Sequence, residues 1–323
     1  MNMPLLDICE LRVHFDTPGG IGRAVSSVNL AIGPGETVGL IGESGCGKSV
    51  TALSVLGLIP TPPGRVVGGS IRFEGSDLLK MNDDAMRRVR GRKIGMIFQE
   101  PMTALNPVLS IGRQVTEPLM AHLGASPDHA RIEASRWLDR VRIPASASCM
   151  NAYPHELSGG MRQRVMIAMA MICKPKLLIA DEPTTALDVT LQQQILSLIG
   201  ELKTELNMAM LLITHDLGVV AQTARRVAVM YAGRIVETAA VGPLFAEPLH
   251  PYTRGLMRST PRLGMPAGQI PEIPGMVPDA TRPAAGCSFA ERCPSVFQRC
   301  RTQGPELTTI RAGRQVSCWL YDK

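Results

Sequence analysis

The 323-residue sequence predicts an α/β fold built on a parallel sheet, and three short apolar runs carry that prediction. The runs are Thr37–Ile41, Leu177–Ala180 and Met210–Thr214. Each is continuous rather than alternating, which is typical of strands buried on both faces of a parallel sheet. Each ends at a polar or glycine-rich turn. Because ligands of such sheets bind outside the carboxyl ends of the strands, we expect the functional residues there.

The regions between and after these strands have a different composition. Helical patterns such as His129–Val141 alternate with Pro and Gly turns and predict a helical insertion at about residues 101–164. The run Arg226–Glu237 predicts a pair of strands. After about residue 240 proline becomes frequent, which favours extended and turn structure. We therefore divide the chain into a domain of residues 1–240 and a small C-terminal extension of residues 241–323.

The composition is that of an ordinary globular protein, with 45% hydrophobic and 19% charged residues, and it excludes a disordered chain. The longest apolar stretch, around Val165–Cys173, is shorter than the roughly 18 residues that a membrane-spanning helix needs. Asp7 and Glu10 lie where a secretory signal would require apolar residues. These features predict a cytosolic chain.

The net charge of +6 has three interpretations: nucleic-acid binding, a position beside an anionic membrane, or a solvated surface with excess arginine. The basic residues are spread along the chain and not grouped, which favours the solvated surface. The eight cysteines of a cytosolic chain are expected to be thiols or metal ligands rather than disulfides.

The first strand leads into a phosphate-binding loop. The segment Gly42-Glu43-Ser44-Gly45-Cys46-Gly47-Lys48-Ser49 fits the pattern G-x-x-x-x-G-K-[S/T] and opens a helical run. Its glycines let backbone N–H groups point at phosphate oxygens, and the helix N-terminus adds partial positive charge. Lys48 is expected to reach the outer phosphates of ATP and Ser49 to bind Mg²⁺. The motif predicts the core of a P-loop NTPase, which is RecA-like.

The second strand ends in two carboxylates, Asp181 and Glu182. Asp181 is expected in the Mg²⁺ shell, directly or through water. Glu182 lies one residue further on, where it could polarise an attacking water as general base. An apolar run before Asp-Glu is weak evidence alone, and it gains weight from the phosphate loop.

A second glycine-rich helix start is the segment Leu157-Ser158-Gly159-Gly160-Met161-Arg162-Gln163. Ser158 is a candidate N-cap, and Gly159-Gly160 leave N–H groups exposed at the helix start. One phosphate loop needs only one such cradle for its own nucleotide. We infer that the second cradle serves the nucleotide of another subunit.

These motifs resemble the ATP-binding subunits of ABC transporters, in which the segment at Ser158 is the signature motif. In the same order, Gln99 matches the Q-loop glutamine, Thr185-Ala186-Leu187-Asp188 the D-loop, and His215 the switch histidine. Phe15 is the preferred match for the aromatic residue that stacks on adenine, with His14 as an alternative. The resemblance covers nearly the whole chain.

The resemblance implies that two such subunits bind face to face with two ATP molecules between them. Each ATP would lie on the phosphate loop of one subunit and on Ser158, Gly159 and Gly160 of the other. Hydrolysis would drive a membrane pore between two states. His215 would contact the γ-phosphate, and Gln99 would contact Mg²⁺ or the lytic water and relay closure to the membrane subunits.

Two further stretches resemble the dipeptide, oligopeptide and nickel importers. They are Ile97–Pro107 and Leu244–Thr253. Taken by themselves, Gln99–Pro107 is a loop into the helical insertion and His250-Pro251-Tyr252 is a packed turn. The branch implies a second, related ATPase chain, two permeases and an external solute-binding protein, with this chain peripheral at the cytoplasmic face of the inner membrane.

The C-terminal extension contains Cys287, Cys293, Cys300 and Cys318 within 40 residues that hold little apolar material. A metal centre would compensate for so thin a core. The spacing C-x5-C-x6-C-x17-C favours a [4Fe–4S] cluster over zinc, which prefers closer pairs. Some members of the peptide-importer branch carry such a cluster at similar cysteines. Four reduced, buried thiols are the alternative.

The leading functional hypothesis is an ATPase that energises uptake of peptides, with nickel or another small solute as the alternative cargo. A soluble ABC-type ATPase acting on nucleic acid or ribosomes is a competing class, but such proteins often carry two cassettes or a coiled-coil insertion. A non-catalytic subunit is disfavoured by intact Lys48, Asp181, Glu182 and His215. We expect no nucleic-acid partner.

Overall fold

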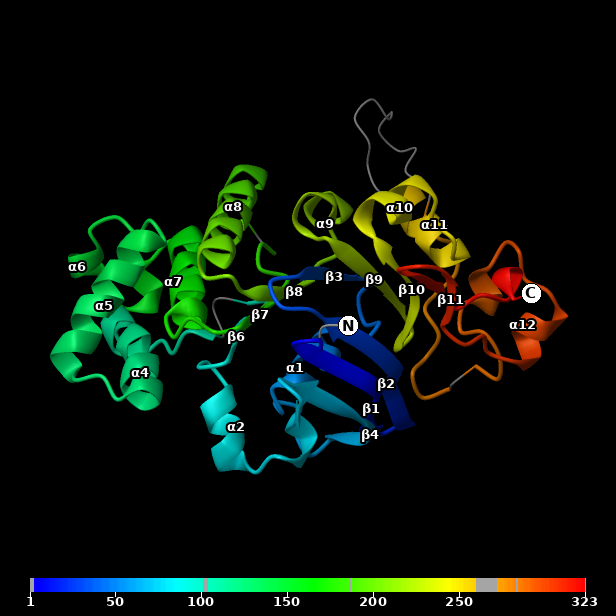
Figure 1. Ribbon diagram of the computed structural model, residues 1–323, viewed down its shortest axis with the longest axis horizontal. Coiled ribbons are helices and arrows are strands. Elements are labelled where there is room, and N and C mark those ends of the chain that lie inside the picture. The colour runs from blue at the N-terminus through cyan, green and yellow to red at the C-terminus, as the bar shows by residue number, and fades with distance from the viewer. Residues whose placement is uncertain (1–2, 101–103, 186, 260–271, 283, 323) are drawn as a thin grey trace. The chain divides into compact units, whose positions relative to one another are not determined.

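The computed structural model describes residues 3–100, 104–185, 187–259, 272–282 and 284–322. The chain divides into two compact units. Unit 1 comprises Met1–Ile32, Thr37–Leu79 and Leu212–Lys323, and unit 2 comprises Gly33–Glu36 and Lys80–Leu211. Both units contain strands and helices, as the α/β prediction requires (Figure 1).

Unit 1 begins with an antiparallel ribbon that the sequence analysis did not anticipate. Leu6 in the first strand of this ribbon lies opposite Ile32 in the second strand. On the other side, Leu6 lies opposite Phe73 in the third strand. Leu6, Ile8, Leu11 and Val13 are all at most 1% exposed, so alternate side chains of the first strand face the core. The strands are β1 (Leu6–Thr17), β2 (Gly20–Ile32), β4 (Gly64–Phe73) and β5 (Ser76–Asp77).

The phosphate-loop strand β3 (Thr37–Ile41) lies in unit 1 parallel to β9 (Arg226–Tyr231). All five β3 residues are buried, as expected for a strand covered on both faces. The strand β10 (Arg234–Ala240) runs antiparallel to β9, which confirms the strand pair predicted from sequence. The turn between them uses Ala232 and Gly233 at positive φ.

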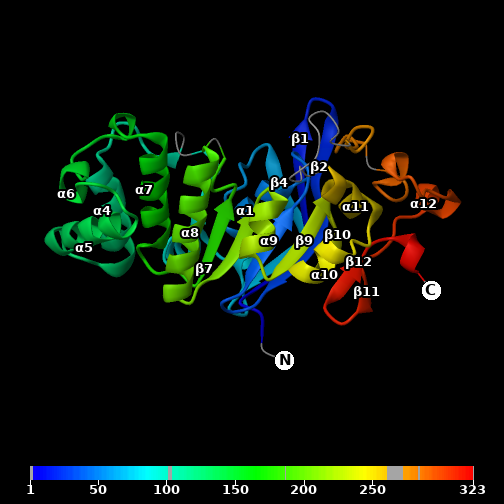
Figure 2. The ribbon, with the colours of Figure 1, turned by 90° about the horizontal axis from the view of Figure 1, so that it is seen from above.

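The described residues after β10 pack back onto this sheet and form only short helices, in agreement with the proline content of the segment (Figure 2). Three aromatic rings, from Tyr231, Tyr252 and Phe289, lie within 5.5 Å of one another between centroids. Residues before and after position 240 therefore share one hydrophobic cluster. The remaining elements of unit 1 are α1 (Lys48–Val55), α9 (Leu217–Thr223), α10 (Val241–Ala246), α11 (Pro251–Arg258), α12 (Gln298–Thr302), β11 (Thr308–Arg311) and β12 (Arg314–Val316).

Unit 2 contains the other predicted buried strands. The strand β6 (Ile94–Ile97) is parallel to β7 (Leu177–Asp181), with Ile94 opposite Leu177. The strand β8 (Ala209–Ile213) is the other neighbour of β7, and its first three residues belong to this unit. Every residue of β7 and β8 is buried, which confirms the prediction that both strands are covered on both faces.

Helices follow β6, as predicted for the insertion, although its residues 101–103 lie outside the described residues. Ser110 and Ser126 cap two of these helices, each accepting a backbone N–H with its hydroxyl. Helices of this region pack against one another, as Figure 1 shows. The helices of unit 2 are α2 (Asp83–Val89), α4 (Ile111–Leu123), α5 (Pro127–Arg140), α6 (Ser146–Cys149), α7 (Gly159–Met171) and α8 (Val189–Glu205). Over the described ranges, the structure contains no helix with the length and apolarity needed to cross a bilayer.

Candidate active site

The phosphate loop follows β3 and leads into α1, as predicted. Gly42 and Gly47 have φ values of 158° and 105°. A Cβ at Gly42 would come within 2.2 Å of the Met230 carbonyl oxygen, and one at Gly47 within 2.5 Å of the Ala24 carbonyl oxygen. Backbone packing therefore requires glycine at both positions. Gly45 differs, because a Cβ there would meet nothing within 4 Å, although its φ of 76° still favours glycine.

Lys48 lies at the start of α1, with its side chain folded back over the loop. Its Nζ donates to the carbonyl oxygens of Gly42 at 2.8 Å and Glu43 at 2.9 Å. It also lies 3.7 Å from the Cys46 Sγ. The residue is only 6% exposed, so a buried ammonium group is held beside the loop that would receive phosphate. Such a charge is strongly attractive to a polyanion.

His215 lies at the same end of the unit 1 sheet as the phosphate loop. The Thr214 N–H donates to the Leu40 carbonyl oxygen at 3.4 Å, which places the end of β8 beside the end of β3. His215 follows directly and is exposed. Asp216 caps α9 by accepting the Gly218 and Val219 N–H groups, and this fixes the turn that carries the histidine.

A cavity of about 430 Å³ adjoins the phosphate loop in unit 1. Gly45 lines it together with His14. Burial and the neighbouring arginines lower the pKa of His14, so its imidazole is neutral at physiological pH. Phe15 points to the other face of β1, where a Cβ at Gly64 would lie 2.7 Å from its Cε1. Basic residues also line the cavity: Arg12, Arg23 and Arg234.

The two carboxylates at the end of β7 have different surroundings within unit 2. Asp181 is 4% exposed and ends the strand. Glu182 has a φ of 47°, an unusual backbone conformation for a residue other than glycine and one that clusters at functional sites. Its Oε2 accepts hydrogen bonds from Gln99 Nε2 at 3.1 Å and Thr185 Oγ1 at 2.8 Å. The predicted Q-loop glutamine and the predicted general base are therefore in contact.

The signature segment also lies in unit 2, at the start of α7. Ser158 caps this helix by accepting the Met161 N–H, as predicted. Gln163, one turn on, donates to the Pro183 carbonyl oxygen at 2.5 Å and so links the helix to the segment that holds Glu182. Asp188 caps α8 by accepting the Leu191 N–H at 2.9 Å. Ala186 of the predicted D-loop is outside the described residues.

The four C-terminal cysteines line one small cavity of about 10 Å³ in unit 1. That volume admits about one water-sized sphere, which is too small for a four-iron cluster. Among the residues with described positions, no group of three or more His, Cys, Asp or Glu side chains is arranged to hold a metal ion. Burial raises the pKa of Cys287, Cys293 and Cys318, with the value for Cys318 at about 11. The thiols as placed thus do not fit the predicted [4Fe–4S] cluster.

Two residues that contact the phosphate loop were missed by the sequence analysis. Tyr252 Oη accepts the Glu43 N–H at 2.8 Å, and Arg292 forms an ion pair with the Glu43 carboxylate. Tyr252 does belong to the packed turn predicted at 250–252, but it also reaches the loop. No local pattern signals these contacts, because the partners are 209 and 249 residues apart.

Matches to protein-family models and to known relatives identify the family of this chain. The model described as "ABC transporter" matches residues 25–185, and that described as "Oligopeptide/dipeptide transporter, C-terminal region" matches residues 236–300. A Sinorhizobium fredii protein called a probable peptide ABC transporter ATP-binding protein, y4tR, is 53% identical over 98% of this chain and 94% of its own length. The chain belongs to the ATP-binding subunits of ABC transporters, in the oligopeptide/dipeptide branch.

A second relative matches along nearly the whole chain, and a solved ATP-binding cassette shares the fold. The Bacillus subtilis oligopeptide transport ATP-binding protein AppD is 49% identical over 99% of this chain and 97% of its own length. The dimeric ATP-binding cassette MJ0796, solved in a post-hydrolysis state with ADP and Pi, has a TM-score of 0.66 at 28% identity. The matched region covers 73% of this chain and 98% of the cassette. This likeness confirms the predicted P-loop NTPase fold of the ABC subunit.

The start of α11 in this ABC subunit makes a pH-dependent contribution to stability. His250 is 1% exposed, its Nδ1 accepts the Tyr252 N–H at 3.0 Å, and burial lowers its pKa to about 3. Below about pH 6.5 the unfolded chain binds a proton at His250 that the folded chain excludes. The free energy of unfolding therefore decreases as the pH is lowered. We expect this group to remove about 2 kcal/mol between about pH 6.5 and pH 5.

Urea unfolding at both pH values measures this loss in the wild type and in His250→Asn, which keeps a capping acceptor but cannot titrate. The asparagine variant should lose less stability on acidification than the wild type. The exposed His129→Asn is the control and should keep the wild-type dependence. Identical pH dependence of the wild type and His250→Asn would contradict the assignment.

Proposed function

We propose that this chain binds and hydrolyses ATP as a subunit of an importer that takes up di- and oligopeptides across the cytoplasmic membrane. The observation that carries the proposal is similarity to peptide-transport ATP-binding proteins along nearly the whole chain, which keeps the phosphate loop of residues 42–49 and the carboxylates Asp181 and Glu182. The Bacillus subtilis dipeptide transport protein DppD adds to it, at 48% identity over 99% of this chain. The subunit would be peripheral at the cytoplasmic face.

Each step of hydrolysis would depend on one of the residues that the sequence analysis assigned to the site. Lys48 would bind the outer phosphates, and Ser49, Gln99 and Asp181 would hold Mg²⁺. The ion would neutralise charge on the phosphates. Glu182 would accept a proton from the attacking water, because hydrogen bonds from Gln99 and Thr185 hold its carboxylate in place. His215 would donate to the γ-phosphate.

The signature segment would serve the nucleotide of a second subunit. Gly160 is favoured by packing, since a Cβ would lie 2.6 Å from Leu191 Cδ2 and the end of that side chain would have to move. Gly159 has no such reason, because it is exposed and a Cβ there would meet nothing within 4 Å. Open backbone at a helix start is what an anion requires. Ser158 is exposed beside it, and Asp188 would lie at the same interface.

The partners follow from the same proposal. A second, related ATP-binding chain would complete the nucleotide sites, two permeases would form the pore, and a solute-binding protein would deliver the peptide. We retain the division into residues 1–240, with a helical subdomain at about 101–164, and 241–323. The two family models match separate ranges, residues 25–185 and 236–300, and the second begins close to the proposed boundary.

A metal centre at the four C-terminal cysteines stays a prediction. Its support is that four thiols from separate segments line a single cavity. A [4Fe–4S] cluster would require these segments to move apart, since the cavity measures about 10 Å³. Elemental analysis after anaerobic purification tests the cluster: about four iron atoms per chain, lost in Cys300→Ala, would support it. An iron-to-protein ratio near zero in the wild type would contradict the cluster.

Affinity purification of the tagged chain from detergent-solubilised native membranes tests the proposed function. Recovery of two multi-spanning permeases and a second ATP-binding chain is the expected result. Peptide binding by the accompanying solute-binding protein would fix the cargo, whereas nickel binding would replace peptide by nickel. Recovery from the soluble fraction with ribosomes or nucleic acid, and without permeases, would contradict a role in transport.

A further inference from the structure

The C-terminal extension holds one residue of the phosphate loop at both its backbone and its side chain. Arg292 donates through Nη1 to Glu43 Oε2 at 2.8 Å and through Nη2 to Glu43 Oε1 at 3.0 Å. Tyr252 accepts the Glu43 N–H. A guanidinium fork paired with both carboxylate oxygens fixes orientation as well as distance. Glu43 therefore has little freedom to turn.

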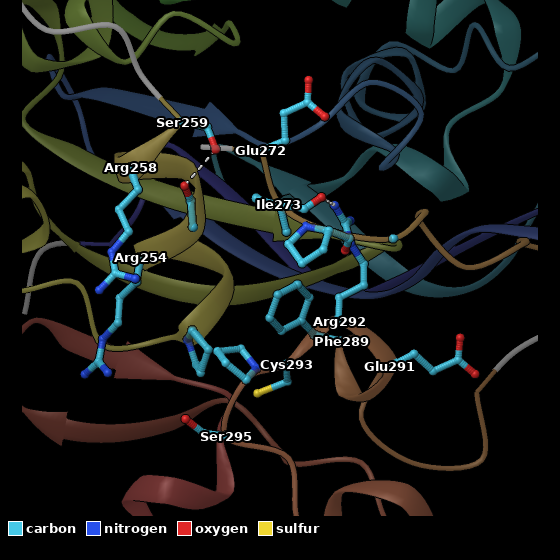
Figure 3. A pocket seen from close by; sticks show the side chains of 15 residues that line it. Arg254, Arg258, Ser259, Glu272, Ile273, Phe289, Glu291, Arg292, Cys293 and Ser295 are labelled. Carbon is cyan, nitrogen blue, oxygen red and sulfur yellow. Dashed lines mark hydrogen bonds between the residues drawn. The ribbon is translucent and has the colours of Figure 1, made fainter. Parts of the chain in front are cut away.

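Arg292 is itself fixed by the extension. Its Nε donates to the Pro274 carbonyl oxygen at 2.9 Å, and Nη2 to the Ile273 carbonyl oxygen at 3.1 Å. Its guanidinium carbon lies 5.9 Å from the centre of the Phe289 ring. In Figure 3, Arg292 and Phe289 lie on one side of a cavity of about 610 Å³, and Arg254 of α11 lies on the other. The Arg292 side chain is only 6% exposed, so this is not a solvated surface pair.

Glu43 also contacts Lys48, the lysine that is expected to bind phosphate. The carbonyl oxygen of Glu43 accepts a hydrogen bond from Lys48 Nζ, as does that of Gly42. A rotation of Glu43 would move this carbonyl and with it one of the two oxygen partners of the ammonium group. Arg292 and Tyr252 thus act on Lys48 through a single residue of the loop.

The loop pattern itself does not explain a carboxylate at position 43. The four x positions of G-x-x-x-x-G-K-S accept any residue, because the backbone makes the cradle. Burying an arginine–carboxylate pair is also a weak source of stability compared with packed apolar side chains. The pair is better explained by the geometry that it imposes on the loop.

We propose that Arg292 is a positioning residue for the phosphate loop, through which the C-terminal extension sets the affinity of the subunit for ATP. This inference rests on the proposed ATPase function and adds a role for the extension within it. The segment Ile273–Arg292 then controls the nucleotide site without contacting the nucleotide. Breaking the pair should weaken ATP binding while the chain stays folded.

The test is equilibrium binding of ATP to the full chain, with KM and kcat for hydrolysis and the melting temperature measured on the same samples. Arg292→Ala should raise the Kd for ATP roughly 5- to 20-fold, which is less than the full loss of a hydrogen bond to a charged group, because Arg292 acts through Glu43. Glu43→Gln should have a similar effect, and Arg292→Lys a smaller one. The control is Arg299→Ala, which removes an exposed arginine paired with Asp322 in the same extension and should leave Kd unchanged.

Double substitution separates positioning from a general structural role. Because the two residues act as one pair, Arg292→Ala/Glu43→Gln should bind ATP no more weakly than Arg292→Ala alone. Additive losses, or unchanged Kd in Arg292→Ala and Glu43→Gln with a normal wild type, would overturn the inference. If Arg292→Ala does not fold, Glu43→Gln decides, since it keeps the size of the side chain. A wild-type chain that binds no ATP would instead contradict the proposed function.

Discussion

Replacing Glu182 by Gln is expected to leave ATP binding intact and to lower hydrolysis by about 10²- to 10⁴-fold. Glutamine keeps the shape of the side chain and an oxygen that can accept from Gln99 and Thr185, but it cannot take a proton from water. The positive φ of Glu182 supports this assignment, because such backbone conformations are retained where position matters more than stability. Phosphate release and ATP binding, measured on the same preparation, give the two quantities.

The control for this variant is Glu201→Gln, which neutralises an exposed carboxylate paired with Arg142 in the same unit. An exposed pair contributes little to stability, so its turnover should equal that of the wild type. Undiminished hydrolysis by Glu182→Gln would show that another group activates the water. Loss of ATP binding in the same variant would show that the carboxylate has a structural role in the nucleotide site.

Replacing Lys48 by Ala is expected to raise the Kd for ATP by about 10²-fold and to abolish hydrolysis at ordinary ATP concentrations. The lysine supplies the buried charge beside the loop, and its Nζ now bonds two loop carbonyls that a shorter side chain cannot reach. The measurement is binding of a fluorescent ATP analogue, with the melting temperature to verify folding. Lys80→Ala, at an exposed position, is the control. Unchanged affinity in a folded Lys48→Ala would contradict the phosphate-loop assignment.

The sequence predicted well those parts of the site in which local chemistry decides the structure. The apolar run Thr37–Ile41 coincides with β3, and Ser158 caps α7 as its position before two glycines indicated. Both depend on neighbours a few residues away. The contact between Gln99 and Glu182 was not predicted, because 83 residues separate them and no local pattern joins them.

Other features could not be predicted from local patterns. The ribbon of β1, β2 and β4 has long strands with several register shifts, which blur the alternation on which strand prediction depends. Proline at the first position of α11 suits a helix start, so a proline-rich segment still contains short helices. The pairing of Arg292 with Glu43 depends on tertiary packing alone.

The cysteines illustrate a partial success. Their clustering in the sequence predicted that they would come together, and all four line one cavity. Ligand geometry does not follow from spacing, and the distances among thiols depend on how the surrounding turns pack. The identity of any metal therefore has to come from analysis of the purified protein.

The most direct test of the central claim is uptake of short radiolabelled peptides by cells that lack this chain and are supplied with the wild type or with Glu182→Gln. The account predicts that deletion abolishes uptake by this route and that the wild type restores it. Glu182→Gln should assemble with the permeases in equal amount and restore no uptake. Unchanged peptide uptake in the deletion strain, or full restoration by Glu182→Gln, would contradict the claim that ATP hydrolysis by this subunit drives peptide import.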